Sequence, residues 1–329
     1  MQTEVLQITP DSLQKAKALF ERGEIVAIPT ETVYGLGAIG TNPDAVKKIF
    51  TAKGRPSDNP LIAHVHKDYD LSKLVYIEND YAQKLIKAFM PGPLTLVFNS
   101  KGVVCKEAVA GGETLAVRMP SHKDCQELLR LVDAPIVAPS ANVSKHTSPV
   151  TAEHVYNDLN GKIPLILDGG KCTGGIESTV LDVTDKVPRI LRAGLVTKEM
   201  IISVVGCCEI ASHLSTDKVK SPGVKYTHYK PKCETRLFDE EDLDVLMEEY
   251  RRIEVQGKSA YVLCSSQIAK KLDGFKILDL GETAEEIASN LYDKLLYGEK
   301  VADVILAVKM PNEEGVYLGV SNRLNKSCG

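Results

Sequence analysis

The chain contains no tryptophan, and its eight cysteines form no C-x-x-C pair. Structural zinc sites use cysteines or histidines at short paired spacings, and the adjacent Cys207 and Cys208 do not fit such a site. We therefore expect most of the cysteines to be small buried hydrophobic residues in a reducing compartment.

Long apolar runs are also missing, because charged or polar residues interrupt each run before about 18 residues, the length that a spanning helix needs. The first residues, Met1 to Glu4, lack the basic-then-apolar layout of a signal peptide. Both absences predict a cytoplasmic protein with no membrane partner. The net charge of −4 argues against strong, general nucleic-acid binding, although it leaves a local basic patch open.

The chain has 329 residues, which predicts two domains. Residues 1–211 alternate strand-like and helix-like segments, which indicates an α/β domain with a large mixed sheet. Residues 212–234 are rich in lysine and poor in aliphatic residues, which predicts a basic linker, and Tyr226 and Tyr229 distinguish it from a plain flexible tether. Residues 235–329 predict a second, smaller α/β domain.

Apolar periodicity predicts the individual elements. We expect one helix capped by Asp11 and ending at Gly23, and another that begins after Asn42-Pro43 and is followed by Gly54. The expected strands are 25–28, 61–65, 94–98, 114–118, 136–138, 165–167, 178–183, 189–191, 260–263, 276–280 and 304–308. Further helices are expected over 81–89, 125–131, 152–158 and 285–296.

Two glycine motifs suggest nucleotide binding but are incomplete. Gly35 to Gly40 matches G-x-G-x-x-G, yet Pro29 ends the preceding strand early and the next helix starts only after Asn42. Gly257-Lys258-Ser259 has Arg252 where a P-loop needs its first glycine. Neither motif supports a dinucleotide fold or a P-loop.

Two other side-chain groupings are equally weak. His64 and His66 would share a strand face, as some metal ligands do, but no third ligand stands at a convincing spacing. Ser140 with His64 lacks the G-x-S-x-G turn of a serine hydrolase.

Stronger signals come from polar groups placed beside apolar runs. Lys53 and Arg55 follow the second helix, where they could simply be solvated cations that offset the helix dipole. Gly54 and Pro56 restrict the backbone around them, and a fixed Lys/Arg pair suits phosphate oxygens. The pattern therefore favours an anion site, with Asn59 among its polar neighbours.

Thr114 and Arg118 share one face of an expected strand. A buried arginine needs a partner, which could be a substrate carboxylate or a structural Asp or Glu. Ser140 and Asn142 follow another strand, where small residues let a ligand approach, although they could instead cap their own turn. The basic linker could fold over a nucleotide with a tyrosine on the base, or it could be inert.

Together these segments resemble the YrdC/Sua5 family, in its two-domain Sua5 type. The motifs that carry the resemblance follow family order and span essentially the whole chain: 29–37, 53–64, 90–95, 116–120, 138–144, 167–170, 177–179, 221–229 and 319–324. The resemblance implies a YrdC-like N-terminal domain with helices around a concave electropositive cavity, and a Rossmann-like C-terminal Sua5 domain.

It also implies the activity of a threonylcarbamoyl-AMP synthase, a nucleotidyltransferase that uses L-threonine, bicarbonate or CO₂, and ATP and releases diphosphate. Its product serves the N6-threonylcarbamoylation of adenosine 37 in tRNAs reading codons that begin with A, through downstream transfer proteins. ATP is then a substrate, and Mg²⁺ is expected although no carboxylate cluster marks its ligands.

The family's functional positions fall on particular residues of this chain. The Lys-x-Arg and Ser-x-Asn signatures correspond to Lys53, Arg55, Ser140 and Asn142. The threonine-binding positions are Thr32, His64, Arg118, Ala138 and Ser178. The ATP-binding positions are Arg55, Asn59, Thr114, Ser140, Ser148, Arg192 and a linker tyrosine, either Tyr226 or Tyr229. Two alternatives stay open: a carbamoyl-adenylate enzyme with another acceptor, and a non-enzymatic RNA-binding module.

Overall fold

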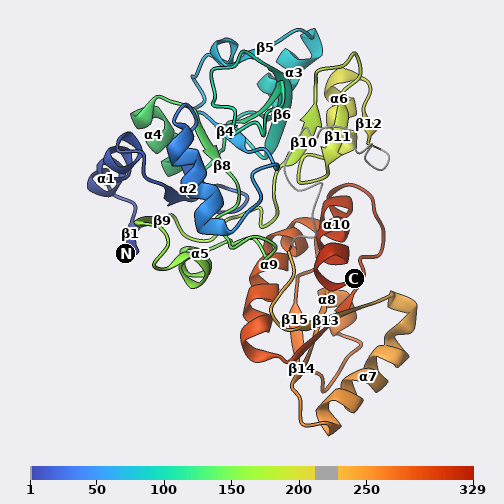
Figure 1. Ribbon diagram of the computed structural model, residues 1–329. Coiled ribbons are helices and arrows are strands. Elements are labelled where there is room, and N and C mark those ends of the chain that lie inside the picture. The colour runs from blue at the N-terminus through green and yellow to red at the C-terminus, as the bar shows by residue number, and fades with distance from the viewer. Residues whose placement is uncertain (1, 212–228) are drawn as a thin grey trace.

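A mixed sheet of twelve strands forms the first unit of the computed structural model, which describes residues 2–211 and 229–329 (Figure 1). Across the sheet the strands are β1 (Glu4–Gln7), β9 (Leu165–Asp168), β2 (Val26–Ile28), β3 (Gly35–Ile39), β8 (Ile136–Ala138), β4 (Ile62–His64), β7 (Thr114–Arg118), β6 (Leu94–Ser100), β10 (Thr179–Asp182), β11 (Arg189–Arg192) and β12 (Glu209–Ile210), with β5 (Val75–Tyr76) beside β6. Parallel and antiparallel pairs alternate irregularly, which confirms the predicted mixed sheet.

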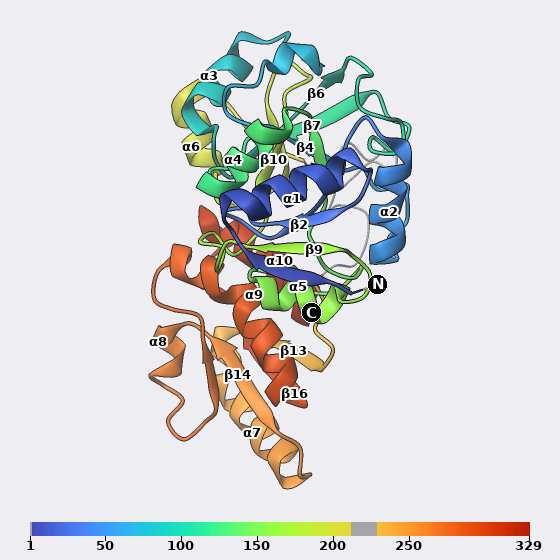
Figure 2. The same cartoon turned by 90° about the vertical axis from the view of Figure 1, so that its left-hand side faces the viewer.

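Helices cover both faces of this sheet because side chains alternate along each strand. Val26 and Ile28 of β2 pack in one apolar cluster with helices α1 (Pro10–Glu21) and α4 (Lys123–Val132). Ala27 belongs to the cluster on the other side, with helices α2 (Pro43–Lys53) and α5 (Ala152–Leu159). Figure 2 shows α1 in front of β2 and β9. Helices α3 (Asp80–Phe89) and α6 (Lys198–Val205) lie farther along the sheet, and a 3₁₀ turn covers Leu71–Lys73.

The ends of two helices test the capping predictions. The residue that caps α1 is Thr9 and not the predicted Asp11. Thr9 Oγ1 accepts a hydrogen bond from the Ser12 amide, and Ser12 Oγ accepts one from the Thr9 amide. That prediction was wrong by two residues, since Pro10 already occupies the first helical position. For α2 the prediction is confirmed: Asn42 caps the start, and Gly54, with φ of 58°, ends the helix in the left-handed region.

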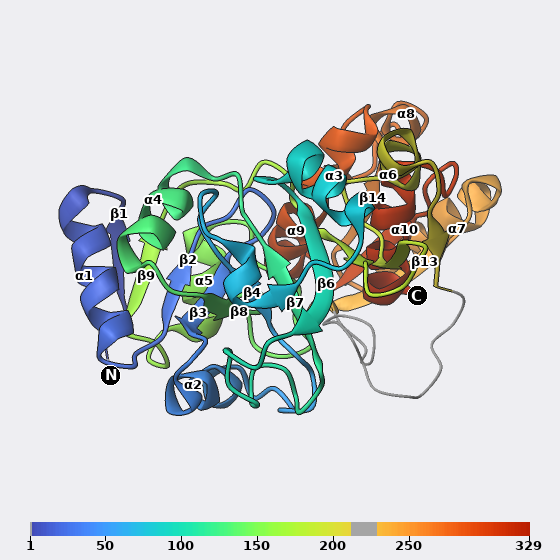
Figure 3. The same ribbon diagram turned by 90° about the horizontal axis from the view of Figure 1, so that it is seen from above.

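The second unit is a four-stranded parallel sheet in the order β13 (Glu234–Phe238), β16 (Val304–Val308), β14 (Ala260–Cys264) and β15 (Ile277–Asp279). Its helices are α7 (Leu243–Val255), α8 (Ser266–Ala269), α9 (Ala284–Val301) and α10 (Val316–Cys328), with a 3₁₀ turn at Glu240–Asp242. Figures 1 and 2 both show α9 and α10 between this sheet and the first unit. Figure 3, seen from above, shows α1 and β1 at the end of the first unit that is farthest from the second unit. The predicted second α/β unit is confirmed.

Sequence periodicity missed the strands β1, β3, β5, β12 and β13. It also missed the helices α6, α7, α8 and α10. The glycine-rich segment that forms β3 pairs antiparallel with β2 instead of leading into a helix, which agrees with the rejected dinucleotide motif. The boundaries predicted at residues 211 and 234 stay predictions, and residues 212–228 lie outside the described part. All eight cysteines are free, and five of them are buried. Among the helices of the described residues, none is long and apolar enough to cross a membrane.

Candidate active site

A pocket lies against the middle strands of the first sheet and holds about 630 Å³ of space, its open mouth included. Segments far apart in the sequence contribute to it. The lining residues are Thr30, Thr32, Val33, Gly35, Arg55, Ile62, His64, Arg118, Ala138, Pro139, Ser140, Asn142, His146, Ser148, Glu177, Ser178, Arg192 and Tyr229. Most of the residues predicted for the site are among them.

Strand register brings several of these residues together. Parallel β4 and β7 place His64 beside Arg118, and antiparallel β8 places Ala138 beside Ile62. Ile62 and His64 face the same side because they are two residues apart in a strand. Gly35 of β3 lies so close that a Cβ there would be 3.3 Å from the Ala138 Cβ. The floor of the pocket therefore includes the small residues Gly35 and Ala138, and His64 and Arg118 lie side by side on neighbouring strands.

Arg118 is almost fully buried and already has a protein partner. Its Nη2 lies 2.7 Å from Glu31 Oε1, and its Nη1 donates to Thr32 Oγ1 at 2.8 Å. Burial alone would raise the pKa of Glu31, but the Arg118 charge, the hydrogen bond from Arg118 and hydrogen bonds from backbone amides together outweigh burial and lower that pKa. Of the two partners considered from sequence, a structural carboxylate is therefore present, and any substrate carboxylate would share Arg118 with Glu31.

His64 next to Arg118 is a neutral imidazole. Burial, reinforced by the Arg118 charge, lowers its pKa to about 3. One ring nitrogen, Nδ1, lies 3.0 Å from the Ile62 carbonyl oxygen. At neutral pH this ring offers hydrogen bonding and shape to a ligand without adding charge to the pocket.

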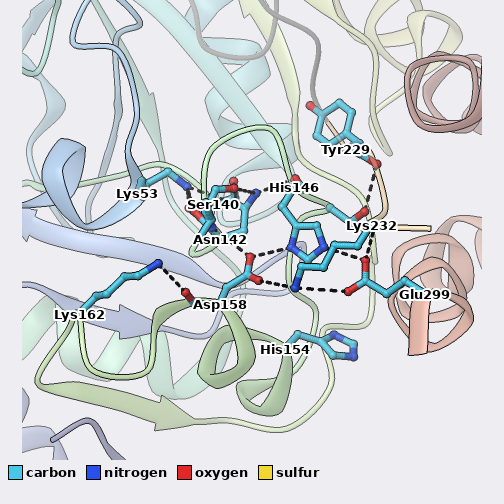
Figure 4. A network of polar contacts seen from close by, with 12 residues as sticks. Lys53, Ser140, Asn142, His146, His154, Asp158, Lys162, Tyr229, Lys232 and Glu299 are labelled. Atoms are coloured by element: carbon cyan, nitrogen blue, oxygen red, sulfur yellow. Dashed lines mark hydrogen bonds and ion pairs between the residues drawn. The ribbon is translucent and has the colours of Figure 1, made fainter. Parts of the chain in front are cut away.

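Lys53 does not line the pocket, although its sequence context predicted a phosphate contact. Its side chain is buried, and Nζ donates to the carbonyl oxygens of Ser140 and Asn142 and, at 3.3 Å, to Asn142 Oδ1 (Figure 4). An ammonium group has three donors, and three loop oxygens accept them here. Burial, with the nearby Arg55 charge, lowers the pKa of Lys53 well below its usual value. This geometry makes Lys53 a support of the Ser140–Asn142 loop.

The same loop is tied internally. Ser140 Oγ donates to Asn142 Oδ1 at 2.5 Å, and Asn142 Nδ2 donates to the His146 carbonyl at 2.7 Å. Asp158 of α5 accepts from the Val143 amide at 3.0 Å and pairs with the His146 ring at 2.7 Å. These contacts, drawn in Figure 4, fix the loop against α2 and α5 before any ligand binds.

Another part of the pocket lining is built around Ser178, directly before β10. Arg192 of β11 donates to the Ser178 carbonyl through Nε at 3.1 Å and through Nη2 at 3.0 Å, and Ser178 Oγ lies 2.8 Å from Thr95 Oγ1. Ser148 donates to Glu177 Oε1 at 2.6 Å. Arg192 thus contributes a second buried guanidinium group to the pocket lining.

The remaining predicted residues are placed less centrally. Arg55 lines the pocket and donates to the carbonyl oxygens of Asn59 and Pro60 at 3.3 and 3.4 Å. Asn59 is buried behind it, and Thr114 lies four residues before Arg118 on β7; neither lines the pocket. Tyr229 lines it, whereas Tyr226 lies outside the described residues.

Two families match the chain in sequence. Residues 18–194 match the family of Sua5, YciO and YrdC, described as telomere recombination, and residues 196–329 match the C-terminal domain of threonylcarbamoyl-AMP synthase. Relatives named threonylcarbamoyl-AMP synthase from Bacillus subtilis and Pyrococcus abyssi are each 42% identical to the chain. These alignments cover 99% of this chain and 96% of the first relative, and 95% of this chain and 93% of the second. The chain belongs to the threonylcarbamoyl-AMP synthase family.

Solved structures of this family agree with the fold. The crystal structure of P. abyssi Sua5 complexed with L-threonine matches with a TM-score of 0.91 and 40% identity, over 99% of this chain and 97% of that one. The predicted family and the two-domain α/β fold are thereby confirmed.

Sequence reasoning did not predict every lining residue of this family member. His146 and Glu177 line the pocket, and Glu31 holds Arg118, but none of the three was singled out as a site residue. Glu31 and Glu177 lie inside motifs that were recognised, directly before Thr32 and Ser178, so the signal was there. His146 had no signal beyond its closeness to Asn142.

No metal centre is built into the described part of the protein, where no group of three or more His, Cys, Asp or Glu residues could hold an ion. Among the residues that the structure describes, Glu177 is the one carboxylate in the pocket lining, and Arg323 and Tyr292 engage it. A single carboxylate that is already engaged by Arg323 and Tyr292 does not fit a metal ion held by the protein itself. No side chain is therefore assigned as a ligand of the expected Mg²⁺.

Proposed function

We propose that this chain joins L-threonine, bicarbonate or CO₂, and ATP to give threonylcarbamoyl-AMP and diphosphate. The observation that carries the proposal is the convergence of Arg55, Arg118 and Arg192 on one pocket, in a chain that matches a threonine-complexed relative over nearly its whole length. Three guanidinium groups around a small-residue floor suit a ligand with a carboxylate and several phosphates.

The proposed roles divide the pocket in two. On the threonine side, Arg118 and Thr32 bind the polar groups of the amino acid, with His64, Ala138 and Ser178 shaping the site. On the ATP side, Arg55, Ser140, Asn142, Ser148 and Arg192 face the nucleotide, and Tyr229 covers it. Lys53 and Asn59 support these groups from behind, and Thr114 is left without a direct contact.

The reaction would need two bonds to form in the pocket. The unprotonated threonine nitrogen attacks the carbon of CO₂, one C=O electron pair moves onto oxygen, and the nitrogen loses a proton to water, which gives a carbamate. A carbamate oxygen then attacks the α-phosphorus, and the bond to the β-phosphate oxygen breaks as its electron pair leaves with diphosphate. The arginines neutralise the charge on the phosphates, so positioning and charge stabilisation supply most of the acceleration. His64 is too weak a base to take the amine proton at neutral pH.

We further propose that Mg²⁺ enters with the ATP phosphates, as nucleotide-bound magnesium commonly does. The product would serve the threonylcarbamoylation of adenosine 37 in tRNA and pass to downstream transfer proteins. A cytoplasmic location remains a prediction from the sequence.

The first test is diphosphate release from ATP by the purified protein with Mg²⁺ and bicarbonate, with and without L-threonine. Release that requires both threonine and bicarbonate supports the proposal, and chelation of Mg²⁺ should stop it. ATP turnover without threonine would indicate another acceptor. No turnover, combined with tRNA binding that weakens steeply with salt, would favour the RNA-binding module.

A further inference from the structure

The second unit reaches the pocket through one buried carboxylate. Glu177 lines the pocket, and its partners Arg323 and Tyr292 come from α10 and α9 of the second unit. We propose that Arg323 and Tyr292 are positioning residues that hold Glu177, and through it the ATP side of the pocket, in a binding-competent arrangement. This inference rests on the proposed function, because it assigns a role within the same site.

Both oxygens of the Glu177 carboxylate are engaged, each from a different side. Oε2 accepts from Arg323 Nε at 3.1 Å and from the Tyr292 hydroxyl at 3.0 Å. Oε1 accepts from Ser148 Oγ, in the first unit, at 2.6 Å. The carboxylate therefore bridges the second unit and a pocket residue, and its orientation depends on both.

Burial makes this bridge hard to replace by water. Arg323 has 0% and Glu177 7% of its surface exposed. Burial alone would raise the pKa of Glu177, but the Arg323 and Arg192 charges, together with hydrogen bonds from Ser148 and the backbone, more than offset burial and lower that pKa to about 2. Burial and the Glu177 charge raise the pKa of Tyr292 well above its usual value, so its hydroxyl keeps the proton that it donates. The network is fixed in one charge state at neutral pH.

Contacts lead from Glu177 directly to proposed ATP contacts. Ser148 donates a hydrogen bond to the Glu177 carboxylate. Ser178, which follows Glu177 in the chain, accepts two hydrogen bonds from Arg192 at its carbonyl oxygen. Arg323 also donates to the Ala193 carbonyl, next to Arg192 in the chain. A shift of Arg323 would therefore be transmitted to both Ser148 and Arg192.

The backbones around this network touch without intervening side chains. Gly175, with φ of 70°, lies against α9 so closely that a Cβ there would collide with the backbone of Ala288 and Ser289. Gly319 of α10 lies against Gly194, where a Cβ would be 3.2 Å from the Gly194 Cα. Close packing on both sides of Glu177 sets the distance between the two units, which suits a positioning role.

The test measures the affinity of full-length variants and of the parent protein for ATP. Titration calorimetry is carried out with Mg²⁺ and ATP, without threonine. Tyr292→Phe removes one hydroxyl and keeps the ring that stacks on Tyr229 at 5.4 Å. We expect ATP binding to weaken at least about fivefold, because a hydrogen bond to a charged group is lost. Tyr297→Phe is the matched control: the same change on the same helix at a residue 53% exposed should leave affinity unchanged.

Two further variants test the route. Arg323→Lys keeps the charge but loses the planar fork, and should weaken ATP binding in the same direction. In a Glu177→Gln background, Tyr292→Phe should add less than about a twofold effect, since the two residues act in series. The inference is overturned if Tyr292→Phe and Arg323→Lys lower the melting temperature yet bind ATP within twofold of the parent, or if the Tyr292 and Glu177 effects add fully. If the parent protein binds no ATP, the proposed function fails instead.

Discussion

At the scale of single residues, Arg118 shows how a site can be assembled before its substrate arrives. Nη2 forms an ion pair with Glu31, Nη1 donates to Thr32 Oγ1, and Nε donates to the Gly92 carbonyl at 3.4 Å. The guanidinium is therefore held in one orientation at the price of competition with Glu31. A substrate carboxylate binds a cation that is already fixed, which reduces the entropy lost on binding.

Arg118→Ala should raise the threonine KM by about tenfold or more, because a charge-assisted contact is lost. ATP affinity should change far less, since Arg192 and Arg55 remain. The single substitution leaves Glu31 buried without its cation, at a cost of about 3–5 kcal/mol. The Arg118→Ala/Glu31→Gln double variant therefore provides the stable background for steady-state kinetics. Unchanged threonine dependence in that variant would remove Arg118 from the threonine side.

Lys53 gives the second prediction at this scale. Lys53→Met keeps the length of the side chain but leaves the Ser140 and Asn142 carbonyls without their donor. We expect a loss of about 3 kcal/mol in unfolding free energy together with weaker ATP binding. Lys47→Met on the same helix, at an exposed position, is the control. A variant of full thermal stability that no longer binds ATP would instead indicate a direct phosphate contact.

At the scale of elements, α2 links local sequence signals to the pocket. Its cap and its glycine stop place Lys53 in the last turn and Arg55 just beyond it. Lys53 then reaches the Ser140–Asn142 loop, while Arg55 turns toward the pocket. The length of this helix therefore determines which of the two cations contacts the loop and which faces a ligand.

Asn42→Ala should remove the acceptor of the Asp44 and Ala45 amides, which lie 3.1 Å away. The expected loss is about 1 kcal/mol of unfolding free energy, measured by denaturant titration. Asn42→Ser, which restores an acceptor, should recover most of it. An equal loss in both variants would show that Asn42 acts by packing against Gly23 rather than by capping.

At the scale of the whole molecule, His146 joins three parts of the chain (Figure 4). Its ring contacts Asp158 of α5 at 2.7 Å and Glu299 of α9 at 2.8 Å. Glu299 also accepts a hydrogen bond from the backbone amide of Lys232 at 3.0 Å. Lys232 lies in the stretch that leads from residue 229 into β13. One protonated ring thus ties the first unit, the second unit and the chain between them.

This bridge predicts a pH dependence of stability. Burial alone would lower the pKa of His146, but the hydrogen bonds to Asp158 and Glu299, together with the charges of these carboxylates, outweigh burial and raise the pKa to about 9. The stabilisation is complete below the unfolded pKa of about 6.5 and is lost as pH rises through about 9, at a cost on the order of 2 kcal/mol. Melting temperatures of the parent protein should therefore fall over this range more than those of His146→Gln. Parallel profiles would contradict the assignment.

The sequence by itself determined the family, the mixed α/β first unit, the second α/β unit and most of the pocket lining. Strands such as Thr114–Arg118 and Ile136–Ala138 were located to the residue, because a short continuous apolar run is a local property of the chain. Short edge strands such as Glu209–Ile210 carry too few residues to show a period, so they were missed.

Only the tertiary structure decided which partner each polar side chain has. Lys53 contacts Ser140, which is 87 residues away in the sequence. Glu177 contacts Arg323 across 146 residues, and His146 contacts Glu299 across 153 residues. Residue type predicts that a buried charge needs a partner but does not name it, because the partner depends on how the layers pack. Sequence patterns report local periodicity, whereas the contacts that shape this pocket join segments that folding alone brings together.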